Sequence, residues 1–144
     1  MLNIIRDISL THDWDLSSVV EAGDKGAADV HWIRRFAEEN GDAIITGDSD
    51  FIRKHQQVIA VFETGVRVIY LPARWSNAII DHKIAHLLQW WNRIETRLAS
   101  MKPRECYEVT WNLQVDADLR KIDIDFHTAF RKLKKAGRKD TGTH

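Results

Sequence analysis

Residues 43–51 read AIITGDSDF, a short apolar run that leads directly into two carboxylates. The run over 43–46 is too brief for a helix and is typical of a buried strand, so Asp48 and Asp50 are expected just beyond the strand's C-terminal end. Sites in open α/β sheets lie at that edge. Two carboxylates there repel each other unless a cation or a proton lies between them, so the segment suits Mg²⁺ or Mn²⁺, with Thr46 able to orient a carboxylate or a water molecule. The alternative is that Asp48 or Asp50 only caps the helix that begins before Phe51.

A third carboxylate, Asp29, stands where a loop gives way to a helix. The loop over 21–27 contains glycine, and the helix expected over 30–39 has an apolar face and a stop signal at Asn40-Gly41. A carboxylate at a helix N-terminus is stabilised by free backbone N–H groups, so capping alone explains this residue. A metal site would require Asp29 to approach the other two carboxylates in the folded chain.

The order of elements along the chain predicts an α/β fold. The clearest strand is 66–71, VRVIYL, which is rich in β-branched residues and is closed by Pro72. A long amphipathic helix is expected over 77–101, while 57–63 suits either a helix or an extended segment. Further expected elements are a helix at 2–11, a strand at 14–20 and a β-like segment at 107–115. Strands alternating with helices predict a three-layer sandwich with a mainly parallel sheet and helices on both faces.

Two parts are expected along the chain, a core over 1–101 and a C-terminal extension over 102–144. The extension holds six Lys and Arg residues within positions 131–139, and this segment either contacts phosphate or forms a solvated helix end. The last nine residues, 136–144, are rich in Gly, Thr and Lys and are predicted to be disordered.

The net charge of zero conceals an uneven distribution of charge along the chain. Residues 1–72 hold 7 Lys and Arg against 12 Asp and Glu, whereas residues 73–144 hold 14 against 9. Either the acidic half carries a metal site beside a phosphate-binding surface in the basic half, or the two halves simply attract each other.

Composition points to a cytoplasmic protein with no membrane partner. Hydrophobic residues make up 44% and charged residues 29%, and no apolar run approaches the roughly 20 residues of a membrane span. The first residues lack the features of a secretory signal. The single cysteine, Cys106, excludes an internal disulfide and is expected to be inert. His82 and His86 have the i,i+4 spacing of a zinc face, but a surface pair is favoured because no acidic partner completes the set.

The ordered set of motifs resembles PIN-like domains of the toxin–antitoxin ribonuclease kind. In that family a loop aspartate opens a helix, and about twenty residues later a strand ends in Thr-x-Asp-x-Asp-Phe. Asp29 matches the first of these, and Asp48 and Asp50 match the pair. The strand with its proline at 66–72 and the tandem tryptophans at 90–91 are similar to one PIN-like subfamily. The resemblance covers roughly residues 1–112.

The resemblance implies a metal-dependent ribonuclease that is the toxin component of a toxin–antitoxin module. Asp29, Asp48 and Asp50 would hold Mg²⁺ or Mn²⁺, with Thr46 in support. RNA, an antitoxin protein and a second copy of the chain are the implied partners. The alternative, from a different functional class, is a non-catalytic PIN-like binding module that meets an antitoxin or self-associates.

The chain departs from the family at its start. PIN-like proteins usually begin with a strand that ends in an aspartate, whereas this chain opens in what resembles the following helix, at residues 2–10. A sheet that lacks a strand leaves backbone N–H and C=O groups unpaired along its neighbour. We therefore expect a dimer or larger species that covers the gap, held partly through residues 2–10 or the exposed region of the sheet, and little nuclease activity in the absence of that strand.

Overall fold

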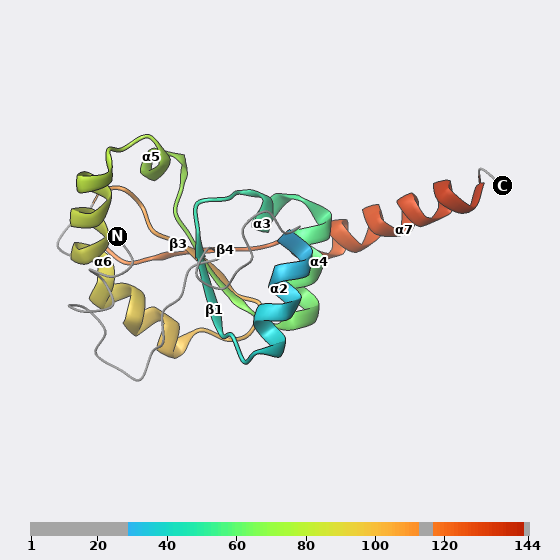
Figure 1. The fold of residues 1–144 in the computed structure, drawn as a ribbon, viewed down its shortest axis with the longest axis horizontal. Helices are drawn as coiled ribbons and strands as arrows, with labels where there is room; N and C mark the ends of the chain where they lie inside the picture. The colour runs from blue at the N-terminus through green and yellow to red at the C-terminus, as the bar shows by residue number, and fades with distance from the viewer. Residues whose placement is uncertain (1–28, 113–116, 143–144) are drawn as a thin grey trace.

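The computed structural model describes residues 29–112 and 117–142, which form a sheet with helices on both of its faces (Figure 1). The described strands follow the order β1-β2-β3-β4, in which the first three are parallel and the last is antiparallel. The strands are β1 (Ala43–Thr46), β2 (Arg67–Tyr70), β3 (Cys106–Glu108) and β4 (Arg120–Ile122). The strands expected at 43–46 and 66–71 are therefore present.

The register of the parallel strands assigns one row of side chains to each face. Ile44 pairs with Val68, and Val68 pairs with Cys106; the next positions along the strands are Ile45, Ile69 and Tyr107. Because side chains alternate along a strand, the two rows point to opposite faces. The first row belongs to one apolar cluster and the second row to another, so the sheet is covered on both sides.

One face is covered by three helices from the N-terminal half, namely α2 (Asp29–Glu38), α3 (Asp50–Arg53) and α4 (His55–Thr64). Ile33 of α2, Phe51 of α3 and Val61 of α4 are at most 2% exposed and pack on the row that contains Val68. The segment 57–63, which suited either a helix or an extended segment, is thus helical.

The opposite face is covered by α5 (Ala73–Ser76) and α6 (Ile80–Ser100). Trp90, Trp91 and Ile94 of α6 pack on the row that contains Ile69. Trp75 of α5 is also buried there, and its indole N–H donates a hydrogen bond to the carbonyl of Val109 at 2.8 Å. Layers on both sides of a mainly parallel sheet confirm the predicted α/β three-layer sandwich.

The C-terminal part contains one strand that the sequence did not indicate and one helix that it indicated only at its basic end. β4 adds an antiparallel strand beside β3, so the sheet continues past residue 101, where a boundary between two parts was expected. The last helix, α7 (Phe126–Gly142), extends away from the body of the molecule (Figure 1). The helix as assigned includes residues 136–142, for which the sequence predicted disorder.

Several expected elements fall outside the described residues. These are the helix at 2–11, the strand at 14–20, the loop at 21–27 and the end of the β-like segment at 107–115. Among the described helices, none combines the length and the apolar character needed to cross a bilayer.

Candidate functional site

A ladder of two hydrogen bonds shapes the turn that follows β1. The hydroxyl oxygen of Thr46 accepts the backbone N–H of Asp48 at 3.0 Å. The Oδ1 atom of Asp48 then accepts the backbone N–H of Asp50 at 2.9 Å. α3 begins at Asp50, so both carboxylates follow the C-terminal end of a strand, as the sequence predicted. Thr46 orients the backbone of this turn rather than a carboxylate directly.

Both carboxylates of this turn also have structural partners. Oδ1 of Asp48 accepts the N–H of Asp50, the first residue of α3, whereas the N-cap position is Ser49, whose side chain forms no cap hydrogen bond. Asp48 thus has a structural role at the helix start, close to the capping considered as an alternative to metal binding. The Oδ2 atom of Asp50 lies 3.1 Å from the ammonium nitrogen of Lys54, one helical turn later. Among the described residues, Oδ2 of Asp48 and Oδ1 of Asp50 have no hydrogen-bond or ion-pair partner. Each carboxylate therefore retains one oxygen for a ligand.

Asp29 is the first residue of α2, and its side chain lies outside the described part of the chain. The backbone nevertheless brings the start of α2 to the same end of the molecule as α3 (Figure 1). One turn after Asp29, the ring of Trp32 lies 5.8 Å from the ring of Phe51, centroid to centroid, and Phe51 directly follows Asp50. The three predicted ligand positions therefore belong to two elements that pack on each other.

The chemistry of the turn can be compared with what a divalent cation requires. Mg²⁺ keeps several water molecules and is usually held by one or two carboxylates together with phosphates of the substrate, so the unpaired oxygens of Asp48 and Asp50 are candidate ligands. Among side chains that the structure describes, no group of three or more His, Cys, Asp and Glu residues could hold a metal. A third protein ligand, if Asp29 is one, thus lies beyond the described side chains.

A row of polar residues at the same edge of the sheet was missed by sequence analysis. The register places Thr46 beside Tyr70, Tyr70 beside Glu108 and Glu108 beside Arg120. Glu108 forms an ion pair with Arg120, and its side chain is only 17% exposed. Tyr70 ends the strand before Pro72, which was a usable signal, but nothing local in the sequence indicates that Glu108 ends a neighbouring strand.

Cys106 and the histidine pair do not form reactive sites in the described part of the chain. Cys106 is fully buried, and burial together with the charge of Glu108 raises the pKa of its thiol to about 12, which keeps it protonated. The ring of His86 stacks on Trp111 at 3.7 Å, and its Nδ1 atom donates a hydrogen bond to the carbonyl of His82 at 2.9 Å. The raised pKa agrees with the inert character expected of Cys106, and His82 is exposed while His86 is partly buried against Trp111.

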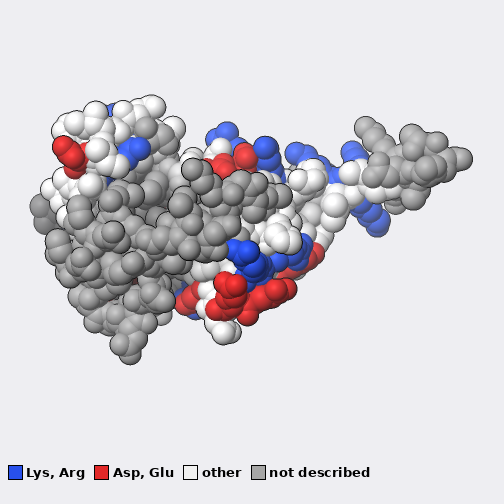
Figure 2. Space-filling model, in the orientation of Figure 1, with Lys and Arg blue, Asp and Glu red and all other residues white. Residues whose placement is uncertain are grey.

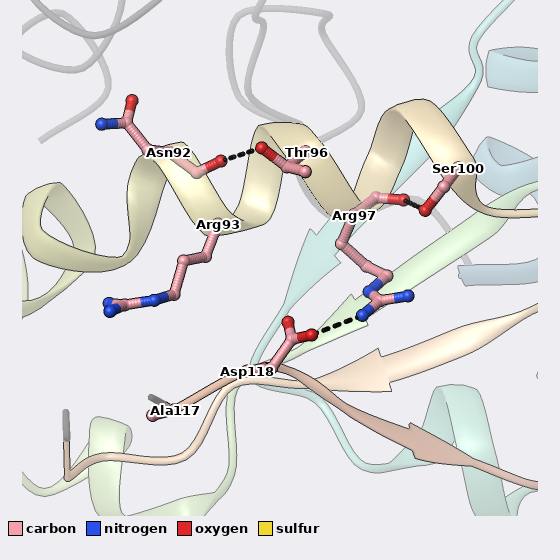
Figure 3. A pocket seen from close by; sticks show the side chains of 7 residues that line it. All are labelled: Asn92, Arg93, Thr96, Arg97, Ser100, Ala117 and Asp118. Carbon is pink, nitrogen blue, oxygen red and sulfur yellow. Dashed lines mark hydrogen bonds and ion pairs between the residues drawn. The ribbon is translucent and has the colours of Figure 1, made fainter. Parts of the chain in front are cut away.

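A pocket of about 510 Å³ lies along α6, on the face of the sheet opposite to α2, α3 and α4 (Figure 3). Its lining residues are Asn92, Arg93, Thr96, Arg97, Ser100, Ala117 and Asp118. Arg97 forms an ion pair with Asp118 at 2.6 Å and lies over the ring of Tyr107 at 4.7 Å. The hydroxyls of Thr96 and Ser100 donate to carbonyls of α6 itself, as Figure 3 shows. Most polar groups of this pocket are therefore already paired within the protein.

Comparison with known families gives a match over residues 2–73 to the model of a PIN like domain. The match spans half of the chain and contains Asp29, Thr46, Asp48 and Asp50. The chain belongs to the PIN-like family. No curated protein and no solved structure matches it.

The PIN-like match covers only part of the sheet that the structure describes. The matched residues supply α2, α3, α4, β1 and β2, together with the turn that carries the paired carboxylates. The segment after Ala73 lies outside the match and supplies α6, β3, β4 and α7. The site predicted from the sequence thus lies within the PIN-like part, whereas Glu108 and the basic helix lie beyond it.

Proposed function

We propose that this PIN-like protein is a metal-dependent ribonuclease and the toxin component of a toxin–antitoxin module. The observation that supports the proposal best is the turn after β1, where Thr46 and Asp48 accept successive backbone N–H groups. That turn holds two carboxylates beside the first turn of α2, at the edge of the sheet where α/β proteins place their sites.

The residues of the proposed site have two roles. Asp29, Asp48 and Asp50 would hold Mg²⁺ or Mn²⁺ through carboxylate oxygens, and Thr46 fixes the turn by accepting the N–H of Asp48. When bound, such an ion activates water and stabilises negative charge on the leaving oxygen of a phosphodiester. Lys54 forms an ion pair with Asp50 at 3.1 Å, so a divalent cation would compete with its ammonium group. We therefore expect metal affinity to rise when this lysine is removed.

The test is RNA cleavage and metal binding by matched variants. Asp48→Asn keeps the hydrogen bond to the N–H of Asp50 but removes a charge from the site, and it should abolish Mg²⁺- or Mn²⁺-dependent cleavage of single-stranded RNA. Asp81→Asn is the control, because Asp81 is exposed in the first turn of α6, on the other layer. Calorimetric metal titration should show binding to the wild type and to Asp81→Asn, with much weaker binding to Asp48→Asn.

Cleavage that persists in Asp48→Asn, or metal binding that this substitution leaves unchanged, would exclude the proposed site. Wild-type protein that neither binds the metal nor cleaves RNA would favour the second candidate function.

The second candidate function is a non-catalytic PIN-like binding module that meets an antitoxin or a second copy of itself. Two observations favour it. Among the described strands β1 pairs only with β2, which leaves one side of β1 without a strand neighbour. Ile79 and Ile80, at the start of α6, are 62% and 59% exposed, and adjacent exposed apolar side chains are typical of protein contacts.

The buried free thiol of Cys106 is compatible with a reducing compartment, and we propose that the protein is located in the cytoplasm.

A further inference from the structure

The last helix is anchored at one end and exposed at the other. Ala129 is 5% exposed and packs with Val58 and Ile59 of α4. The rings of Phe126 and Phe130 both lie 5.2 Å from the ring of Phe62, also on α4. Beyond Phe130, every residue from 131 to 137 is exposed, and the helix leaves the body of the molecule (Figure 1). We call residues 131–137 the arm.

The direction of the arm is fixed by its start. Asp125 precedes α7, and its two carboxylate oxygens accept the backbone N–H of Thr128 at 2.9 Å and the hydroxyl of Thr128 at 2.6 Å. This cap and the aromatic contacts hold the first turns of α7 on α4. α4 directly follows α3, which begins at Asp50, so the arm is attached to the layer that carries the paired carboxylates.

The arm presents a basic face opposite to its apolar stripe. Arg131, Lys132, Lys134 and Lys135 fall within an arc of about 160° when residues advance by about 100° along a helix. The stripe that contains Ala129, Phe130 and Leu133 occupies the other side. The sequence holds no Asp or Glu from 126 to 139, and the three lysines form no ion pair with a described residue. Figure 2 shows Lys and Arg side chains along α7 and also over α3.

We propose that the arm binds the phosphate backbone of RNA, and that Arg53 of α3 and Lys54 after it continue this contact toward Asp48 and Asp50. RNA as the ligand rests on the proposed function. Lysine and arginine side chains contact phosphates without reading sequence, and they position a nucleic acid on the protein surface. Arg53, the last residue of α3, and Lys54, which follows it, are both exposed and lie close to the paired carboxylates. Arg53 gives the phosphate backbone a further contact there, and Lys54 can add one when a phosphate replaces Asp50 as the partner of its ammonium group.

A membrane surface suits the arm less well than RNA does. An interfacial helix buries a face rich in Trp, Phe and Leu among the lipid headgroups. Within residues 131–137, all of them described, Leu133 is the only large apolar side chain, and it is 45% exposed. The two phenylalanines of the helix are used in the contact with α4. The arm thus offers charge for phosphates but little apolar area for insertion.

The test measures RNA binding in the presence of a chelator, so that metal-dependent cleavage plays no part. Affinity of the full chain for a short fluorescent single-stranded RNA is followed as salt is raised. The triple variant Lys132→Gln/Lys134→Gln/Lys135→Gln removes three positive charges, and glutamine has a helix propensity close to that of lysine. The slope of log affinity against log salt should become shallower by about 2, since each contact with single-stranded nucleic acid contributes about 0.7.

The control variant is Arg74→Gln/Lys83→Gln/Lys102→Gln, which removes the same charge from other parts of the surface. It should keep the wild-type slope, and circular dichroism should show unchanged helix content in both variants. An unchanged slope in the arm variant would overturn the proposal, even if the protein cleaves RNA through Asp48. An equal decrease of the salt slope in the arm variant and the control variant would also overturn it. The total positive charge of the protein, and not the position of the arm, would then be the cause.

Two further outcomes separate this proposal from the proposed function. RNA binding that depends on the arm in a protein without nuclease activity would support the arm and count against the ribonuclease. Wild-type protein that fails to bind RNA, but binds vesicles containing an anionic phospholipid through the same lysines, would overturn the arm as an RNA contact.

Discussion

At the scale of single residues, Asn40 and Gly41 together end α2, each for a different physical reason. Asn40 adopts the left-handed conformation with a φ of 68°. The N–H of Gly41 bonds to the carbonyl of Phe36 at 2.8 Å, and the N–H of Asn40 bonds to the carbonyl of Ala37 at 3.0 Å. This pair of bonds is the Schellman arrangement, with asparagine in the position that glycine usually takes.

Gly41 is required for a different reason, which is the space beside it. A Cβ atom at this position would lie 2.4 Å from ring atoms of Phe36, which packs against the α2–α4 side of the core. We expect Gly41→Ala to lower the free energy of unfolding by about 1–3 kcal/mol, since the ring must move out of its packing. Urea unfolding with an unchanged m value measures the difference.

Gly137→Ala provides the matched control for this prediction. Gly137 lies within α7, and a Cβ atom there would meet nothing within 4 Å. The same chemical change should therefore leave stability unchanged or increase the helicity of α7, because glycine is a poor helix former. Equal effects at the two glycines would show that the contact with Phe36 has no role.

At the scale of elements, the start of α7 responds to pH through Asp125. Hydrogen bonds from the hydroxyl and the N–H of Thr128 lower the pKa of this carboxyl below its ordinary value of 3.8, with smaller contributions from His127 and Arg131. A lowered pKa in the folded state means that the stabilisation is present above the unfolded-state value and disappears as pH falls through the folded-state value. The first turn of α7 should therefore loosen below about pH 4.

Asp125→Asn separates this effect from other acid transitions. Asparagine also caps helices well but does not titrate in this range, so the variant should keep α7 helical at a pH where the wild type loses helicity. Circular dichroism between neutral and acidic pH follows the change, with Asp123→Asn as the comparison at a neighbouring exposed carboxylate. Identical titration curves for the wild type and Asp125→Asn would contradict the assignment to Asp125.

Elements with strong local signals were predicted correctly, and elements defined by long-range pairing were not. β1 and β2 have apolar, β-branched sequences that indicate strands by themselves. β4 is Arg-Lys-Ile and has no such signal, so its strand character comes from its pairing with β3. α7 was obscured by its Gly- and Lys-rich composition, although Phe126, Phe130 and Leu133 have the spacing of a helix that packs on one side.

The candidate site shows the same division between local and long-range information. The positions of Asp48 and Asp50 after a strand could be predicted, because they depend on one short segment. The hydrogen bond from the N–H of Asp48 to Thr46 required the structure, since the sequence does not fix the turn geometry. Tyr70 comes beside Thr46, and Glu108 beside Tyr70, only through the register of three strands, which no local pattern encodes.

At the scale of the whole molecule, the described parts leave two features open to a partner. One is the side of β1 that has no neighbour among the described strands, and the other is the pair Ile79 and Ile80. The segment 2–10, which was also expected to contribute to self-association, lies outside the described residues. Exposed strand edges and apolar pairs both favour contact with another chain.

We expect the protein to form a dimer or a larger species, with Ile79 and Ile80 in the contact. Ile79 occupies the N-cap position of α6 without a side-chain cap, so Ile79→Asp should improve the helix start while it removes apolar surface. Ile80→Glu adds a carboxylate to the first turn, which the helix dipole favours. The double variant should therefore be at least as stable as the wild type, yet light scattering should show it as a monomer. A wild type that stays monomeric at high concentration would contradict self-association, whereas a double variant that remains dimeric would exclude this surface and leave the β1 edge as the next contact to test.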